Sequence, residues 1–140
     1  MARDEYLKHL AAVPLFAKCT KAQLVEIGRV ADELTVPAGT VLARQGDVGS
    51  ELFVIVEGTA AVTRDGDPVA TVGAGDFVGE LAVLAQSPRN ATVTAESDLT
   101  VLVLTPTGLS QLLDDIPGLA KHLLYEVVAR LETTDSSHLA

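Results

Sequence analysis

Apolar positions near the start of the chain recur with helical spacing. A first helix is predicted over residues 4–12, ahead of Pro14. A second is predicted to begin at Thr20, because a threonine followed by a glutamine three residues later, here Gln23, forms a capping box. The apolar residues that follow share one helical face: Leu24, Ile27, Ala31 and Leu34. This pattern predicts N-terminal helices over residues 4–34.

From residue 34 to residue 105 the pattern changes to short β-rich runs separated by turns. The runs are Thr40–Arg44, Leu52–Val56, Thr59–Thr63, Val69–Val72, Ala91–Ala95 and Leu99–Leu104. Turn residues at intervals of about 8–12 positions indicate a sandwich or barrel. Asp65-Gly66, between two runs, is typical of a two-residue hairpin. Residues 79–84 are too rich in alanine and leucine for a turn and predict one short helix among the strands.

After Thr105 two more helices are predicted, over residues 106–133. Thr105 can cap the first, and Pro106 suits its first position. The second spans about Leu119–Glu132 and carries two adjacent apolar stripes: Leu119, Leu123, Val127 and Leu131, and Ala120, Leu124 and Val128. Because this face is wider than contact with one surface of the domain requires, we expect a symmetric dimer packed along Leu119–Leu131. The alternative is a wide contact with the barrel within one monomer.

The composition fits one globular domain, expected to span residues 1–140, since the chain has 140 residues and 48% of them are hydrophobic. The longest unbroken apolar runs, such as Leu52–Val56 and Leu81–Ala85, are much shorter than the roughly 20 residues of a membrane span. The start lacks the apolar segment of a signal peptide. Together with a single cysteine, Cys19, this predicts a cytoplasmic location.

The charge of the chain argues against nucleic-acid and membrane partners. Ten basic and nineteen acidic residues give a formal net charge of −9, which repels nucleic acids and anionic membranes. Two tyrosines, three phenylalanines and no tryptophan are too few for a base-stacking platform. An anionic ligand would therefore need a local site.

Residues that commonly carry catalysis do not cluster in the sequence. His9, His122 and His138 lie in the helical ends, far from one another. Cys19 lies beside a helix N-terminus, which can lower a thiol pKa, or it is simply a small half-buried residue. We therefore expect no enzyme, no metal and no cofactor.

The segment Asp76–Thr92 has the most informative chemistry. Gly79 permits a close backbone approach, and the helical turn after it offers N–H groups to an anion. The Glu80 carboxylate can accept hydrogen bonds from hydroxyl groups, and the Arg89 guanidinium can pair with phosphate. Taken singly, Glu80 only complements a helix dipole and Arg89 is only solvated. Taken together, they predict a sugar-phosphate site.

This segment resembles the phosphate-binding cassette of the cyclic nucleotide-binding domain family. That family includes catabolite-activator proteins, protein kinase A regulatory subunits and cyclic-nucleotide-gated channels. The matching motifs are Phe77-Val-Gly-Glu-Leu-Ala82 and Pro88-Arg-Asn-Ala-Thr-Val93, with further matches at Pro37-Ala-Gly39, Arg44-Gln-Gly-Asp47 and Phe53-Val-Ile-Val-Glu-Gly58. The resemblance covers residues 7–134. It implies a mainly β fold, an eight-stranded jelly-roll β-barrel over residues 34–105 flanked by N-terminal helices and two C-terminal helices.

The resemblance also implies roles for single residues. Glu80 accepts from the ribose 2′-hydroxyl, Arg89 pairs with the cyclic phosphate, and main-chain groups complete the phosphate site. The implied ligand-binding residues are Phe77, Val78, Gly79, Glu80, Leu81, Ala82, Arg89, Asn90, Ala91 and Thr134. Thr134 either meets the adenine or belongs to a frayed polar tail. Asn90 departs from the family habit of alanine or serine in cAMP binders and threonine in cGMP binders, and the lack of threonine favours cAMP over cGMP.

The function that follows is a regulatory module that binds a cyclic nucleotide and signals to an effector protein through movement of its C-terminal helices. The alternative is a barrel of the same fold that has lost ligand binding and serves as a protein-interaction or dimerisation module. Glu80 and Arg89 favour the first, because the fold needs neither. The sequence leaves open whether the chain is a stand-alone sensor or part of a longer protein.

Overall fold

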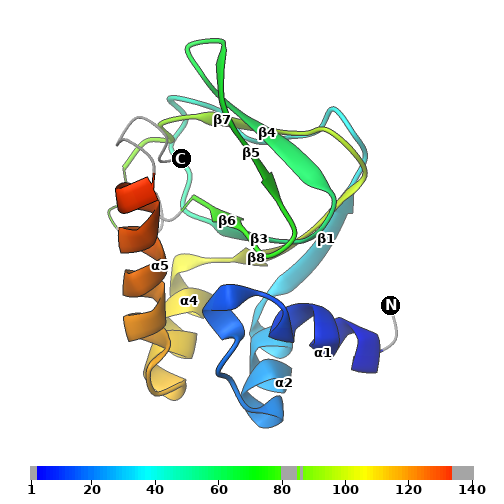
Figure 1. Ribbon diagram of the computed structural model, residues 1–140, viewed down its shortest axis with the longest axis vertical. Helices are drawn as coiled ribbons and strands as arrows, with labels where there is room; N and C mark the ends of the chain where they lie inside the picture. The colour runs from blue at the N-terminus through cyan, green and yellow to red at the C-terminus, as the bar shows by residue number, and fades with distance from the viewer. Residues whose placement is uncertain (1–2, 80–84, 86, 134–140) are drawn as a thin grey trace.

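The computed structural model describes residues 3–79, 85 and 87–133 of the chain. The helical elements of this part are α1 (Arg3–Ala11), η1 (Pro14–Phe16), α2 (Lys21–Val30), α4 (Pro106–Asp115) and α5 (Leu119–Thr133). Its strands are β1 (Asp32–Val36), β2 (Val41–Ala43), β3 (Leu52–Glu57), β4 (Thr59–Arg64), β5 (Asp67–Gly73), β6 (Phe77–Val78), β7 (Thr92–Ala95) and β8 (Leu99–Leu104). The helices α1, α2 and α4 lie together at one end of the strands (Figure 1). Helix α5 extends from this helical end along one side of the molecule toward the sheets.

The strands form two antiparallel four-stranded sheets within the described residues. Their orders are β1-β8-β3-β6 and β2-β7-β4-β5. This confirms the mainly antiparallel jelly-roll fold with helices at both ends of the chain. The described pairing closes no barrel, because β1 and β6 end one sheet and β2 and β5 end the other.

Predicted local signals are found where the sequence places them. Gln23 N donates to Thr20 Oγ1 at 3.2 Å and Thr20 N donates to Gln23 Oε1 at 2.8 Å, which completes the capping box of α2. Gly108 N donates to Thr105 Oγ1 at 3.0 Å, and Pro106 begins α4. These contacts confirm the predicted starts of both helices.

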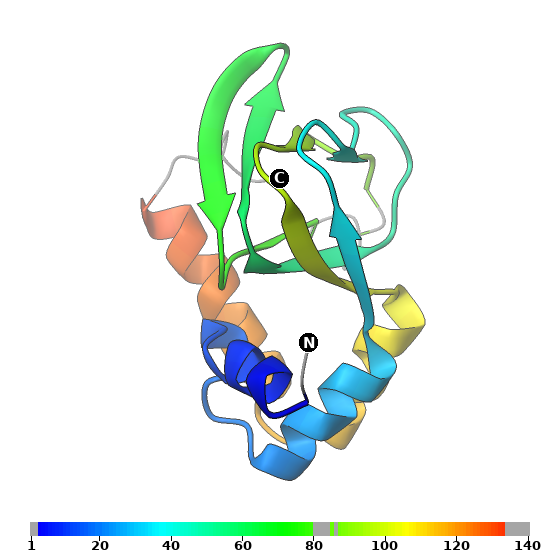
Figure 2. The same cartoon turned by 90° about the vertical axis from the view of Figure 1, so that its right-hand side faces the viewer.

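The β4–β5 hairpin turns at Asp65-Gly66, as predicted. Asp65 has φ +53° and Gly66 has φ +84°, the positive values that a type I′ turn requires at both central residues. The hairpin extends away from the N-terminal helices in both views (Figures 1 and 2). Its tip therefore lies at the opposite end of the sandwich from α1 and α2.

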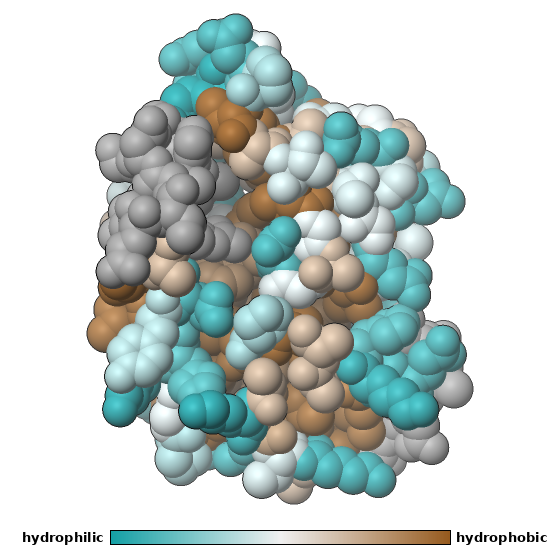
Figure 3. Space-filling view, in the orientation of Figure 1, coloured by the Kyte–Doolittle hydropathy of each residue, from teal (hydrophilic) through white to brown (hydrophobic). Residues whose placement is uncertain are grey.

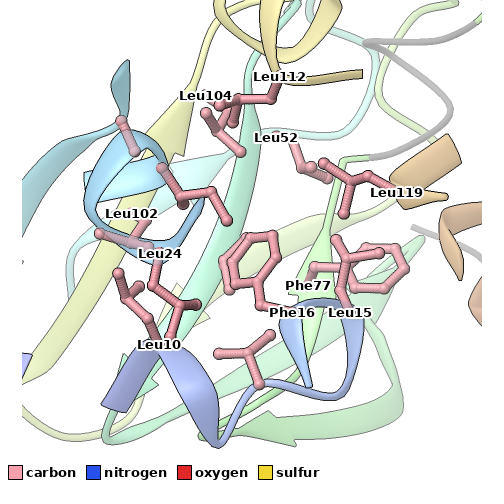
Figure 4. Close-up of a cluster of buried hydrophobic side chains, with 14 of the residues drawn as sticks. Leu10, Leu15, Phe16, Leu24, Leu52, Phe77, Leu102, Leu104, Leu112 and Leu119 are labelled. Carbon is pink, nitrogen blue, oxygen red and sulfur yellow. The ribbon is translucent and has the colours of Figure 1, made fainter. Parts of the chain in front are cut away.

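Strand β3 is apolar and buried from Leu52 to Val56, because both of its faces are covered there. Phe53 and Ile55 pack between the two sheets, whereas Leu52, Val54 and Val56 pack against the helices. Figure 4 shows the helical side of this core. Because successive side chains of a strand point to opposite faces, this apolar run contributes both to the core between the sheets and to the core beneath the helices.

The prediction that the N-terminal helices reach residue 34 is wrong. Helix α2 ends at Val30, and β1 begins at Asp32 and pairs with β8, with Leu34 opposite Val101. Leu34 is 43% exposed, so it does not extend the buried stripe. Ladder hydrogen bonds to β8 stabilise an extended chain that local periodicity assigned to a helix. The short strand β6, which pairs with β3, was also missed.

The short helix predicted over residues 79–84 lies, after Gly79, outside the described residues. Among the helices that the structure describes, none combines the length and the apolar character needed to cross a membrane.

Candidate functional site

Arg89 is a buried arginine at the centre of the candidate site. It is only 7% exposed, which is rare for this residue type. Its Cζ lies 5.5 Å from the centre of the Phe53 ring, within cation–π range. Its backbone N–H donates to the Asp47 carbonyl at 2.9 Å, and its own carbonyl accepts from Gly46 N at 2.8 Å. The turn at residues 44–47 therefore holds the main chain of Arg89 in place.

Two glycines leave the space that the Arg89 guanidinium occupies. A Cβ at Gly49 would lie 2.4 Å from Arg89 Nε, and a Cβ at Gly79 would lie 2.4 Å from Arg89 Nη1. Gly79 also has φ +93°, a conformation that other residues rarely adopt. Sequence reasoning expected a close approach at Gly79, and in the structure the approaching group is the guanidinium itself.

A carboxylate lies beside the guanidinium. Glu51 Oε1 is 3.6 Å from Arg89 Nη2, and the Glu51 side chain is 44% exposed. Sequence reasoning did not identify Gly49, Glu51 or Phe53 as site residues. Phe53 begins one of the further family matches, but that match assigned it no role in the site, and no motif includes Gly49 or Glu51. Their contacts with Arg89 depend on how residues 46–51 and β3 pass beside a segment about 40 positions later.

The residues after Arg89 are held by hydrogen bonds from distant segments of the chain. The Asn90 carbonyl accepts from Arg64 Nε at 2.9 Å, and Thr92 Oγ1 accepts from Gln45 N at 3.0 Å. Asn90 Oδ1 is buried and has no hydrogen-bond partner among the residues that the structure describes. Ala91 is buried, with 2% exposure. The structure therefore brings Gly79, Arg89, Asn90 and Ala91 into one region.

The other predicted site residues have different positions. Phe77 points into the helical core, near Leu15 and Phe16 (Figure 4), and Val78 packs between the sheets. Their buried side chains anchor β6 and so position Gly79. The remaining predicted residues lie outside the described part of the chain: Glu80, Leu81, Ala82 and Thr134.

The cysteine and histidines do not form a second site. Burial raises the pKa of the Cys19 thiol, so the lowered pKa considered for a helix N-terminus is wrong, because desolvation of the thiolate dominates. In the described ranges, no three side chains from histidine, cysteine, aspartate and glutamate are grouped as a metal site would need. His138 lies outside those ranges.

Comparison with known families identifies the domain. The model of the cyclic nucleotide-binding domain matches residues 33–115, which is more than half of the chain. The chain belongs to the cyclic nucleotide-binding domain family. The matched region includes both sheets, Arg89 and most of its neighbours in the site.

Several relatives of this cyclic nucleotide-binding domain are regulatory proteins. A cyclic nucleotide-gated potassium channel from Rhizobium etli is 42% identical over 122 residues, 85% of this chain and 34% of the channel. A cAMP-dependent protein kinase regulatory subunit from Aspergillus niger is 30% identical over 126 residues, 89% of this chain and 31% of the subunit. The catabolite activator protein of Thermus thermophilus superposes with a TM-score of 0.80 at 25% identity, over 87% of this chain and 60% of that one. The chain spans about a third of the length of the two curated relatives.

Proposed function

We propose that this domain is a regulatory module that binds a cyclic nucleotide, with cAMP preferred over cGMP. The observation that carries the proposal is the buried Arg89 guanidinium, which lies between two glycines and over Phe53. Burying a charge is costly in free energy, and pairing with an anion offsets that cost. A cyclic phosphate is an anion that a planar guanidinium can bind through two parallel hydrogen bonds.

The other contacts follow from the family motif. Glu80 accepts from the ribose 2′-hydroxyl, and main-chain N–H groups near Gly79, Leu81, Ala82, Asn90 and Ala91 complete the phosphate site. Phe77 and Val78 support it from the core. Thr134 is one candidate to cover the adenine. If the residues after Glu132 are only a polar tail, Asn90 is the candidate that reads the base. The preference for cAMP is supported by relatives named as cAMP-dependent regulatory subunits and by the lack of threonine at position 90.

The output of the module is movement of α4 and α5, which an effector protein reads. Leu119 and Leu123 attach α5 to the helical core, and this core includes residues of β3, the strand that also carries Phe53. A ligand that changes the packing beside β3 therefore has a short route to α5. A cytoplasmic location and the absence of enzymatic activity belong to the same proposal.

Homodimerisation along α5 is the second part of the proposal. Leu124 and Tyr125 are 59% and 58% exposed, and Val128 is 39% exposed. An apolar groove of about 250 Å³ lies beside them, lined by Leu113, Ala120, Leu123, Leu124 and Val127. Apolar surface is visible on the side of the molecule where α5 lies (Figure 3). The same face would serve the alternative function, a dimerisation module without ligand.

Titration calorimetry with cAMP, cGMP and AMP tests the ligand. Arg89→Ala removes one member of a buried charge pair, so cAMP affinity should fall by about 30-fold or more. Arg29→Ala is a matched control, because Arg29 is exposed, carries the same charge and lies on α2, away from the site. Glu80→Gln should weaken cAMP binding more than 2′-deoxy-cAMP binding. A wild-type chain that binds no cyclic nucleotide would leave the dimerisation module as the function.

Two further measurements test the helices. Ending the chain after Arg130 should weaken cAMP binding and reduce discrimination against cGMP if Thr134 covers the base. Leu124→Glu should convert a dimer to a monomer in sedimentation at high micromolar concentration, because it places charge on the apolar face. A monomeric wild type at that concentration would contradict the dimer.

A further inference from the structure

The last residue of β4 contacts the segment that follows Arg89. Strand β4 pairs with β7 as far as Thr63 opposite Thr92. Arg64 comes next, and its Nε donates to the Asn90 carbonyl at 2.9 Å in a partly buried position. A charged side chain on one strand thus holds a peptide carbonyl two residues before the neighbouring strand begins.

Because a peptide group is planar, the contact between Arg64 and the Asn90 carbonyl also sets the direction of the next N–H donor. The carbonyl of Asn90 and the N–H of Ala91 belong to one trans peptide and point in opposite directions. Arg64 holds the carbonyl, so the Ala91 N–H must point away from Arg64. The Arg89 carbonyl is held in the same way by Gly46 N at 2.8 Å, which orients the Asn90 N–H. Two successive N–H groups, those of Asn90 and Ala91, therefore have set directions.

The hairpin that carries Arg64 is itself tied to this region. Gln45 Nε2 donates to Asp65 Oδ1 at 2.9 Å, and Asp65 N donates to Gln45 Oε1 at 2.8 Å. The Gln45 backbone N–H also donates to Thr92 Oγ1. The double contact keeps the hairpin tip against the 44–47 turn. These contacts therefore fix the position of the strand end that carries Arg64.

We propose that Arg64 is a positioning residue of the phosphate site. It orients the Ala91 N–H toward the ligand through the Asn90 carbonyl, and its charge polarises that peptide so that the N–H is a stronger donor. The inference rests on the proposed function, because the ligand of the oriented N–H groups is the cyclic phosphate. It adds a residue outside the family motif that the sequence analysis identified.

The test compares cAMP binding by the wild type and three variants. Arg64→Ala should lower the affinity by about tenfold, the scale of one charge-assisted hydrogen bond. Arg64→Gln can still donate to the carbonyl without the charge, so it should recover part of the loss. The ³¹P resonance of cAMP bound at saturation should move in Arg64→Ala, because the phosphate loses an aligned donor. Arg29→Ala, on the exposed face of α2 away from the site, controls for net charge and should leave both readouts unchanged.

The outcomes separate this inference from the proposed function. If the wild type binds cAMP and Arg64→Ala keeps both its affinity and its ³¹P shift, the positioning role is overturned and the proposed function stands. Equal losses of affinity in Arg64→Ala and Arg29→Ala would overturn it, because both would then reflect the loss of a positive charge at long range. A lower melting temperature of the unliganded Arg64→Ala chain, with an unchanged ³¹P shift at saturation, would assign Arg64 to stability alone. A wild type that binds no cyclic nucleotide would overturn both proposals.

Discussion

Gly49→Ala should weaken ligand binding while leaving the fold stable. The new Cβ would lie 2.4 Å from Arg89 Nε, 2.7 Å from Nη2 and 2.8 Å from Cζ, whereas ordinary van der Waals contact begins at 3.4 Å. The guanidinium must therefore move by about 1 Å. The guanidinium is the far end of a flexible side chain, and Gly49 has no positive φ, so the cost to folding should be small.

The cost to binding follows from the same displacement. A shift of about 1 Å breaks the alignment of at least one hydrogen bond between the guanidinium and a phosphate oxygen. Such charge-assisted bonds contribute about 1.5–3 kcal/mol, so cAMP affinity should fall by about 10- to 150-fold. Titration calorimetry gives the affinity, and thermal unfolding of the unliganded chain gives the stability.

Gly73→Ala is the matched control for this experiment. A Cβ at Gly73 would have its nearest neighbours at 3.7 and 3.8 Å, and Gly73 has no positive φ. The control should therefore keep both affinity and melting temperature. Full cAMP affinity in Gly49→Ala would refute the position assigned to the guanidinium, and a large loss of stability would show that Gly49 serves the fold instead.

Three other variants test neighbouring parts of the structure. Gly79→Ala should destabilise the fold as well as the site, by about 1–2 kcal/mol from its φ of +93° alone, and an unchanged melting temperature would contradict this. Glu51→Gln removes a half-exposed anion 3.6 Å from Arg89 Nη2, so cAMP should bind about two- to fivefold more tightly, and weaker binding would show that Glu51 supports the site. Burial, with a contribution from Glu33, raises the pKa of Tyr6 from 10.0 to about 12. The unfolded chain therefore loses this proton first, and the free energy of unfolding should decrease between pH 10 and pH 12, less so in Tyr6→Phe, as denaturant titrations at each pH would show.

Part of the fold is determined by residues close together in the sequence. The Thr20 cap, the Thr105 cap and the Asp65-Gly66 turn each depend on contacts within three or four positions, and each is found as predicted. The cassette motif likewise identifies Gly79 and Arg89 from neighbouring residues alone. Such features can be predicted from the sequence because local residues decide the backbone geometry and the short-range hydrogen bonds.

The tertiary structure decided the features whose partners lie far away in the chain. The periodicity ending at Leu34 indicates a helix, but pairing with β8, more than 60 residues later, makes that segment a strand. The neighbours of Arg89 also come from a distance, since Gly49, Glu51 and Arg64 are separated from it by 25 to 40 positions. Which residues meet across such gaps depends on strand register and loop path, and a shift of register by one residue would turn the side chains of a strand to its other face. The sequence by itself therefore identifies Arg89 as the arginine of the site, and the packing of the two sheets determines which residues surround its side chain.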